Sequence, residues 1–138
     1  MTTRNCYQRT RNDHSTELTE DYVEAIADII GEKSTCRVTE LAKRFMVSHV
    51  TVTRILSRLE REKLVKRQPY RPVSLTASGV QLAKQSKQRH DVVLQFLIAL
   101  GVNEKNAAID AEGIEHHVSN ETLNAMDRFA SARSGRAA

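Results

Sequence analysis

The stretch at residues 37–65, RVTELAKRFMVSHVTVTRILSRLEREKLV, restricts the fold more than any other part of the chain. Its apolar side chains recur at the spacing of two short amphipathic helices. We expect Thr39 to cap the first helix and Ser48, after a tight turn at Met46-Val47, to cap the second. The buried stripe of the second helix would consist of Val52, Ile55, Leu56 and Leu59. Two such helices around a tight turn, the second one basic, indicate a helix-turn-helix.

The flanking segments predict a wing and a set of further helices. Helical spacing is present over residues 19–31, before the helix-turn-helix. After it, LVKRQPYRPVSLT alternates around a Pro-rich tip, as in a two-stranded hairpin or wing. Thr76 should cap a long helix over residues 77–100, and shorter helices should begin near Asn103 and after Ser119. The predicted fold is mainly α, with a flexible basic tail at 1–17, a winged helix-turn-helix at 18–76 and a helical dimerisation domain at 77–138.

Basic side chains are concentrated in the first of these domains. Residues 37–71 hold ten Lys or Arg side chains and three carboxylates, whereas residues 76–138 hold seven of each sign. A basic first half beside a neutral second half indicates nucleic-acid binding by the first half alone. The alternative is a solvated basic face.

The second helix of the helix-turn-helix has one face free for the major groove. At about 100° per residue, this face carries Val50, Thr51, Arg54 and Arg58. Arg54 could pair with guanine O6 and N7, and Val50 could meet a thymine methyl group. The helix N-terminus and the arginines of the wing suit backbone phosphate. The predicted contacts to double-stranded DNA are Ser48, His49, Val50, Thr51, Arg54, Arg58, Arg67 and Arg71.

The long helix predicts a second copy of the chain. Its end, VVLQFLIAL, is apolar on every side, and one chain has little with which to cover it, so we expect a homodimer. The longest apolar run, residues 96–100, is far shorter than the ~20 residues of a membrane helix. Two isolated cysteines and no signal-peptide core further predict a reduced, cytoplasmic protein without a membrane segment.

Residues 110–117 read DAEGIEHH and gather three acids and two histidines. If the surrounding segment is helical, Glu112, Glu115 and His116 stand at i, i+3 and i+4 and project from one face. Such a face serves as a solvated acidic surface, as a catalytic site or as a metal site. The residue pattern alone leaves these three alternatives open.

Further candidate ligands lie elsewhere in the chain. Asp21 and Glu24 stand at i and i+3 on the first helix, away from its apolar stripe, and His90 is the one histidine of the long helix. Carboxylates with one or two imidazoles and no thiolate favour Mn²⁺ or Fe²⁺ over Zn²⁺ or Cu⁺. We expect His117 to point away from the ligands. Gly113 is either a point of close backbone approach or a tolerated weakness in a helix.

The sequence does not favour an enzyme. It lacks the HExxH and HxxEH motifs of zinc proteases and the paired Glu-x-x-His helices of di-iron bundles. No Ser, Cys or Lys stands in a recognisable nucleophile setting. The alternative within this class is a small metal-dependent hydrolase.

The order of these parts resembles the diphtheria toxin repressor family of metal-dependent transcriptional repressors, in its manganese transport regulator branch. The matching motifs are DYVEAI, ELAKRFMVSHVTVTRIL, RHDVVLQFLIALGV and DAEGIEHHVS, between about Leu18 and Phe129. The resemblance implies a homodimeric winged-helix repressor of metal-uptake genes that binds operator DNA with Mn²⁺ as corepressor. It implies no protein partner besides a second copy. A winged-helix regulator that responds to iron or to a non-metal signal is the alternative.

The resemblance also implies a site between the two domains for two Mn²⁺ ions per subunit, with Fe²⁺ as the alternative metal. The family's ligands fall on Asp21, Glu24, His90, Glu112, Glu115 and His116. Glu112 and Glu115 would bridge the two ions. The chain departs from the family's pattern at Val50, where relatives often have proline, and at Pro72, where glycine is common. The basic tail is a third departure.

Overall fold

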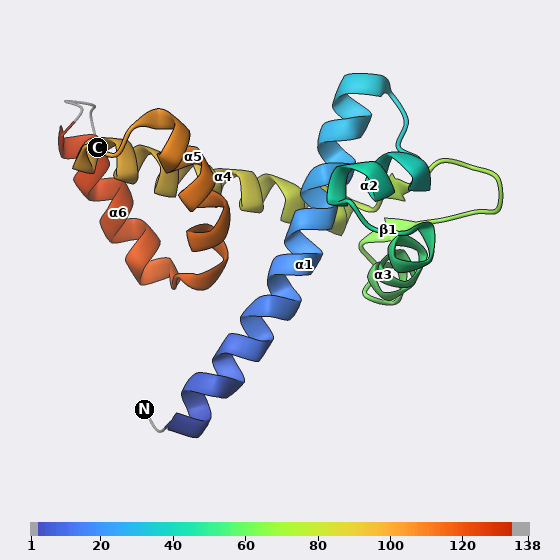
Figure 1. The fold of residues 1–138 in the computed structure, drawn as a ribbon, viewed down its shortest axis with the longest axis horizontal. Helices are drawn as coiled ribbons and strands as arrows, with labels where there is room; N and C mark the ends of the chain where they lie inside the picture. Colours follow the sequence, from blue (N-terminus) through green and yellow to red (C-terminus); the bar gives the residue numbers. More distant parts are fainter. Residues whose placement is uncertain (1–2, 134–138) are drawn as a thin grey trace. The chain divides into compact units, whose positions relative to one another are not determined.

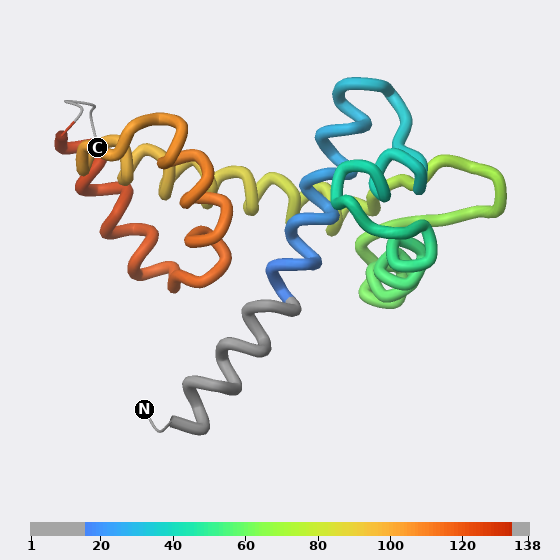
Figure 2. Tube along the Cα trace, in the orientation of Figure 1, coloured from blue at the N-terminus to red at the C-terminus, as the bar shows by residue number. Residues whose placement is uncertain are grey.

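The computed structural model describes residues 3–133, with side chains from residue 16 onward, so most side chains of the predicted tail lie outside it (Figure 2). The elements in chain order are α1 (Thr3–Lys33), α2 (Val38–Phe45), α3 (His49–Arg61), β1 (Val65–Lys66), β2 (Ser74–Leu75), α4 (Ala77–Leu100), α5 (Glu104–Ile114), the 3-10 turn η1 (Glu115–His117) and α6 (Asn120–Arg133) (Figure 1). The mainly α fold with a small two-stranded wing is confirmed. Within these residues, no helix has the length and apolarity to cross a membrane.

Contacts divide the chain into two compact units. The winged unit, Leu18–Gln85, holds α2, α3 and both strands. The helical unit joins the residues up to Glu17 with those from Ser86 onward and holds α5, η1 and α6. The change of unit therefore falls inside α4, whereas the sequence analysis placed a boundary at the first residue of this helix. Helices α1 and α4 each contribute residues to both units.

The core of the winged unit forms where α1 packs against α2 and α3. Its most deeply buried side chains are Tyr22, Ile26, Cys36, Leu41, Val52, Leu56 and Leu59. Tyr22 stacks on Phe45 of α2, with ring centroids 4.1 Å apart and the ring planes at 4°. Burial, followed by the charge of the nearby Glu40 carboxylate, raises the pKa of the Cys36 thiol to about 11. The apolar stripe predicted for the second helix of the helix-turn-helix, which is α3, faces this core, since Val52, Leu56 and Leu59 belong to it.

The wing and the start of α4 are joined by hydrogen bonds. The antiparallel ladder pairs Val65 with Leu75 and Lys66 with Ser74. Thr76 caps α4 as predicted, because its hydroxyl accepts from the Gly79 amide at 3.1 Å and donates to the Lys63 carbonyl oxygen at 2.7 Å. A Cβ atom on Gly79 would overlap the Leu64 carbonyl oxygen, so only glycine fits where α4 passes this backbone.

The helical unit has a smaller core. Val93 of α4, Ala111 of α5 and Leu123 of α6 are buried together. Phe96 meets Phe129 edge to face, with centroids 5.5 Å apart. The apolar end of α4 is incompletely covered within one chain, since Leu100 remains 53% exposed. This exposed apolar surface agrees with the expectation of a second copy.

Two other predicted helix starts are confirmed. The Ser48 hydroxyl accepts from the Thr51 amide at 3.1 Å at the start of α3. The Ser119 hydroxyl accepts from the Thr122 amide at 3.2 Å at the start of α6. Each side chain satisfies a backbone donor that has no partner within the first turn of its helix. Gly101, the predicted stop of α4, adopts a positive φ of 103°.

Two predictions about helix starts were wrong. Helix α1 begins at Thr3, far before residue 19, because no proline or glycine interrupts the chain before Gly31. Thr39 does not cap α2, which begins one residue earlier. Its N-cap is Arg37, whose amide donates to the Glu40 carboxylate at 3.2 Å. A capping carboxylate three residues downstream can replace a capping hydroxyl.

Candidate metal centre and nucleic-acid interface

The segment with the acidic motif ends helix α5 instead of continuing it. Helix α5 stops at Ile114, and the next three residues tighten into η1. Glu112 therefore belongs to the last turn of α5, whereas Glu115 and His116 belong to η1. The condition that the whole motif is helical thus holds only up to Ile114, because Val118 adopts extended backbone before α6 begins. A Cβ atom on Gly113 would meet nothing within 4 Å among the described atoms, which favours the tolerated weakness.

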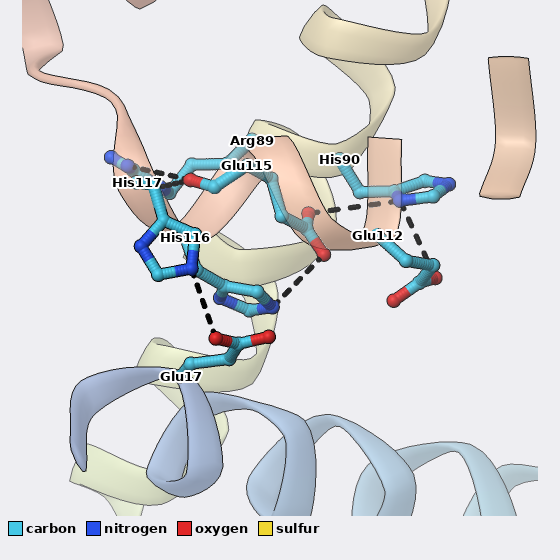
Figure 3. A network of polar contacts seen from close by, with 7 residues as sticks. All are labelled: Glu17, Arg89, His90, Glu112, Glu115, His116 and His117. Carbon is cyan, nitrogen blue, oxygen red and sulfur yellow. Dashed lines mark hydrogen bonds and ion pairs between the residues drawn. The ribbon is translucent and has the colours of Figure 1, made fainter. Parts of the chain in front are cut away.

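Four of the six predicted ligands gather in the helical unit (Figure 3). His90 Nδ1, from the middle of α4, lies 3.4 Å from Glu112 Oε1 and 3.7 Å from Glu115 Oε2. His116 Nε2 lies 3.3 Å from the other Glu115 oxygen. The Glu115 side chain is fully buried, His116 is 5% exposed, and Glu112 stands at the rim. The cluster thus has a buried carboxylate at its centre and a ring nitrogen on each side.

These atoms fit a divalent cation. One oxygen or nitrogen each from His90, Glu112 and Glu115 lies within 4.8 Å of the other two. Octahedral coordination with bonds of about 2.2 Å places ligand atoms about 3.1 to 4.4 Å apart. His90 Nδ1 is buried and forms no hydrogen bond with any described residue. A buried carboxylate beside such a nitrogen is costly without positive charge, which a cation would supply.

Arg89 holds the turn that carries two of these ligands. Its guanidinium donates to the Glu115 carbonyl oxygen at 2.8 and 3.1 Å and to the Val118 carbonyl oxygen at 2.8 Å. A further nitrogen lies 3.3 Å from the Asn120 side-chain oxygen. The last carbonyl groups of a helix have no hydrogen-bond donor within the helix. A guanidinium, with five N–H groups in one plane, can donate to several of them at once. Arg89 was not among the predicted site residues, although this arginine directly precedes His90.

Glu17 is a second residue that the sequence analysis missed. Its carboxylate lies 3.0 Å from His117 Nε2, and one of its oxygens lies within 4.8 Å of a His116 ring nitrogen. His117 thus points away from the Glu115 carboxylate, as predicted, and faces Glu17 (Figure 3). Glu17 had been assigned to the tail, where no partner could be inferred.

The other two predicted ligands belong to the winged unit. Asp21 and Glu24 lie one turn apart on α1, and both side chains are half-buried. They are therefore placed on one flank of a helix that also contributes to the core. That Asp21 and Glu24 bind the same metal ions as the four ligands of the helical unit stays a prediction.

Some side chains of the predicted DNA-binding surface are exposed to solvent, and others form hydrogen bonds within the protein. Ser48, His49, Arg54 and Arg71 are exposed, and Val50 is 76% exposed at the start of α3. Thr51 is half-buried, and its hydroxyl oxygen accepts from Ser48 Oγ at 3.0 Å. The exposed side chains at the start of α3 have the chemistry that base edges in a major groove require, whereas Arg71 belongs to the wing.

Two arginines of this predicted face are engaged within the winged unit. Arg67 of the wing lies 3.3 Å from the Ser57 hydroxyl and 3.5 Å from the Thr53 carbonyl oxygen. The wing is thus tied to the surface of α3. Arg58 donates to the Glu62 carboxylate at 3.1 Å and to the Thr19 hydroxyl at 3.0 Å. Both arginines therefore have partners within the winged unit.

A winged helix-turn-helix joined to a helical unit with a histidine–carboxylate cluster defines a metal-dependent DNA-binding regulator. Residues 14–73 match the family described as "Iron dependent repressor, N-terminal DNA binding domain". Residues 76–133 match "Iron dependent repressor, metal binding and dimerisation domain". The chain belongs to this iron-dependent repressor family.

Individual relatives are transcriptional regulators by name. Transcriptional regulator MntR of Escherichia coli O6:H1 is 46% identical over 123 residues, which cover 89% of this chain and 79% of the relative. HTH-type transcriptional regulator MntR of Bacillus subtilis (strain 168) is 36% identical over 115 residues, which cover 83% and 79%. Both relatives are transcriptional regulators by name, and neither name describes a hydrolase.

Solved structures show the same fold. A chain described as "Manganese-dependent transcriptional repressor complex with manganese" has a TM-score of 0.72 and 26% identity, covering 82% of this chain. "Structure of the manganese regulator SloR" has a TM-score of 0.69 and 26% identity, covering 80% of this chain. This chain spans about half the length of these two solved chains, 52% in each case.

Proposed function

We propose that this chain is a manganese-responsive repressor that binds operator DNA as a homodimer when Mn²⁺ occupies its ligand cluster. The observation that carries the proposal is the buried Glu115 carboxylate between the ring nitrogens of His90 and His116. The similarity to solved structures of regulators described as manganese regulators supports the choice of metal. The acting compartment would be the cytoplasm, and the regulated genes would serve metal uptake.

Each proposed ligand contributes a hard oxygen or an imidazole nitrogen. The proposed set is Asp21, Glu24, His90, Glu112, Glu115 and His116. Glu112 and Glu115, which both face His90, would be shared by two ions. Bound metal would supply the positive charge that draws carboxylates of both units together. A site without thiolate favours Mn²⁺, with Fe²⁺ as the nearest competitor.

The DNA-binding surface would be the exposed start of α3. Val50 and Arg54 would read base edges, while His49 and the N-terminus of the helix at Ser48 would contact base edges or phosphate. Arg71 on the wing would contribute affinity without sequence preference. The Thr51 hydroxyl, which forms a hydrogen bond with the Ser48 hydroxyl, would contact base edges or phosphate.

The homodimer would place two recognition helices on one duplex. In the helical unit, apolar side chains such as Leu100 and Ile109 are 53% and 62% exposed, so a second copy would cover apolar surface here. A two-fold dimer requires a two-fold operator, with half-sites about one helical turn or more apart. Metal would strengthen DNA binding only if it binds the DNA-competent arrangement of the dimer more tightly than other arrangements. DNA must then strengthen metal binding by the same factor.

The experiment begins with the selection of operators from random-sequence duplexes, in parallel with Mn²⁺, with Fe²⁺ under anaerobic conditions and with EDTA. Fluorescence anisotropy then gives the affinity of the wild-type chain for each selected duplex. We expect Mn²⁺ to tighten binding by about 5–150-fold over EDTA. Equal affinity with Mn²⁺ and EDTA would refute the proposal, and a response to Fe²⁺ alone would replace manganese by iron.

Matched acid variants on α1 identify the ligands. Glu24→Gln should lose the response to Mn²⁺, because it removes a proposed charged ligand. Glu32→Gln makes the same chemical change on an exposed position of the same helix and should keep the response. A full response in Glu24→Gln would remove this residue from the proposed set.

A further inference from the structure

Arg58 of α3 has its guanidinium turned back toward α1. Its Nε donates to Glu62 at 3.1 Å, and another nitrogen donates to Thr19 Oγ1 at 3.0 Å, in a partly buried contact. The Thr19 side chain is 7% exposed. A helical wheel places Arg58 beside Arg54, on the face open to DNA, but the two side chains differ. Arg54 is exposed, whereas only 32% of the Arg58 side chain is exposed.

The partner of Arg58 stands in the turn of α1 that carries a proposed metal ligand. Thr19 and Asp21 are two residues apart, so they point to nearly opposite sides of the helix, about 200° apart. One side of this turn contacts the recognition helix, while the other side presents the carboxylate. Intrahelical hydrogen bonds make the backbone of one turn move as a unit.

The same turn is also fixed to α2. Tyr22 follows Asp21 directly, and its ring stacks on Phe45 with centroids 4.1 Å apart. An apolar stack holds the distance between the helices but has no directional donor. The hydrogen bond from Arg58 to Thr19 is directional and joins α3 to α1, so it restricts the rotation of α3 relative to α1 in addition to the apolar packing. A charged hydrogen bond in a partly buried place is also stronger than a neutral one at the surface.

We propose that Arg58 is a positioning residue, not a DNA contact: through Thr19 it couples the turn of α1 that carries Asp21 to the recognition helix. This inference rests on the proposed function. A shift of the turn at Asp21 changes the place of Thr19 and, through the Arg58 fork, the orientation of α3. The pair is a link by which the state of the ligand cluster reaches the DNA-reading face.

The test uses Thr19→Val, which removes the hydroxyl and keeps the shape of the side chain. Thr16→Val makes the same change at an exposed position of α1 and serves as the control. We expect Thr19→Val to bind a selected duplex in EDTA as tightly as the wild type does. Its gain in DNA affinity on adding Mn²⁺ should fall by about tenfold, or disappear where the wild-type gain is smaller, since tenfold is near the low end of the effect of one charged hydrogen bond. Thr16→Val should keep the wild-type gain.

Arg58→Lys separates the two roles of the arginine. A lysine keeps the positive charge, so it would preserve a phosphate contact, but it lacks the fork that reaches Thr19 and Glu62 together. We expect Arg58→Lys to reduce the Mn²⁺ response as much as Thr19→Val does, and the double variant to be no worse than either single variant. Retention of the full response in both single variants, while the wild type responds, would overturn the link.

Metal-free measurements complete the test. In EDTA and without DNA, a double-mutant cycle on thermal unfolding should give a non-zero coupling between Thr19 and Arg58.

If Arg58 instead contacts phosphate, Arg58→Ala would weaken DNA binding equally with and without Mn²⁺ and lower the salt slope by about 1. That outcome would overturn the inference and leave the proposed function intact. A wild type that ignores Mn²⁺ would refute the proposed function itself.

Discussion

The guanidinium of Arg89 donates twice to the carbonyl oxygen of Glu115, at 2.8 and 3.1 Å. The arginine and the proposed ligand His90 are neighbours on α4, while Glu115 begins the turn that carries the buried carboxylate. These hydrogen bonds from a side chain to a backbone carbonyl therefore set the position of the Glu115 backbone relative to His90. A turn held in this way needs less ordering when its side chains bind a cation.

This arrangement predicts a defect in metal affinity for Arg89→Lys. Lysine retains the charge but cannot hold the carbonyl groups of Glu115 and Val118 with one planar fork. We expect Mn²⁺ affinity, measured by isothermal titration calorimetry, to fall about 10–100-fold, the usual effect of losing a group that orients metal ligands. Arg128→Lys on the exposed side of α6 is the control and should bind as the wild type does. An unchanged affinity in Arg89→Lys would show that the turn holds itself.

Adjacent histidines should differ sharply in their contribution to metal binding. His116 is buried against Glu115, whereas His117 hydrogen-bonds to Glu17. We expect His116→Gln to weaken Mn²⁺ binding by at least about 100-fold, beyond the range for a supporting residue. His117→Gln should stay within a few-fold of the wild type. Equal losses in the two variants, measured by equilibrium dialysis, would place both rings on the metal.

Arginines of α3 and of the wing should differ in sequence selectivity. Arg54→Ala removes a group that faces base edges, so discrimination against a substituted base pair should fall by about 1–3 kcal/mol. Arg71→Ala should weaken binding to all duplexes alike and reduce the salt slope by about 1. Anisotropy titrations over a set of single-base operator variants and salt concentrations measure both effects. A selective loss in Arg71→Ala would reassign the wing to base reading.

A pair of glycine variants tests the packing of α4 on the wing. In Gly79→Ala the new Cβ would overlap the Leu64 carbonyl oxygen, so we expect the free energy of unfolding to fall by about 1–3 kcal/mol. Gly31→Ala adds the same group to helix α1 where nothing lies within 4 Å, and should be neutral or stabilise by up to about 1 kcal/mol. Urea denaturation gives both values. A neutral Gly79→Ala would mean that the close approach relaxes freely.

Much of the fold was predictable because local signals decide it. The hydroxyls of Ser48, Thr76 and Ser119 each accept from the backbone three residues later, so the helix starts follow from short stretches. The stripe that includes Val52 and Leu56 faces the core as the helical period requires. Four of the proposed ligands meet as the resemblance implied.

The paths of long side chains were not predictable. A helical wheel gives the direction of the Cα–Cβ bond, and from it Arg58 belonged with Arg54 on the DNA face. The guanidinium lies several bonds farther out, and its partner Thr19 is 39 residues away in sequence. Glu17 and Arg89 were missed for the same reason, since their partners come from distant segments of the chain. The start of α1 was missed because propensity and periodicity are both weak before residue 17.

Reciprocity between metal and DNA is the most direct test of the account. Mn²⁺ affinity of the wild-type chain would be measured by titration calorimetry with and without a saturating amount of the selected duplex. Metal and DNA must strengthen each other by the same factor, so we expect the duplex to tighten Mn²⁺ binding by about 5–150-fold. Identical Mn²⁺ affinities with and without the duplex would contradict the account, because metal would then have no preference for the DNA-bound arrangement.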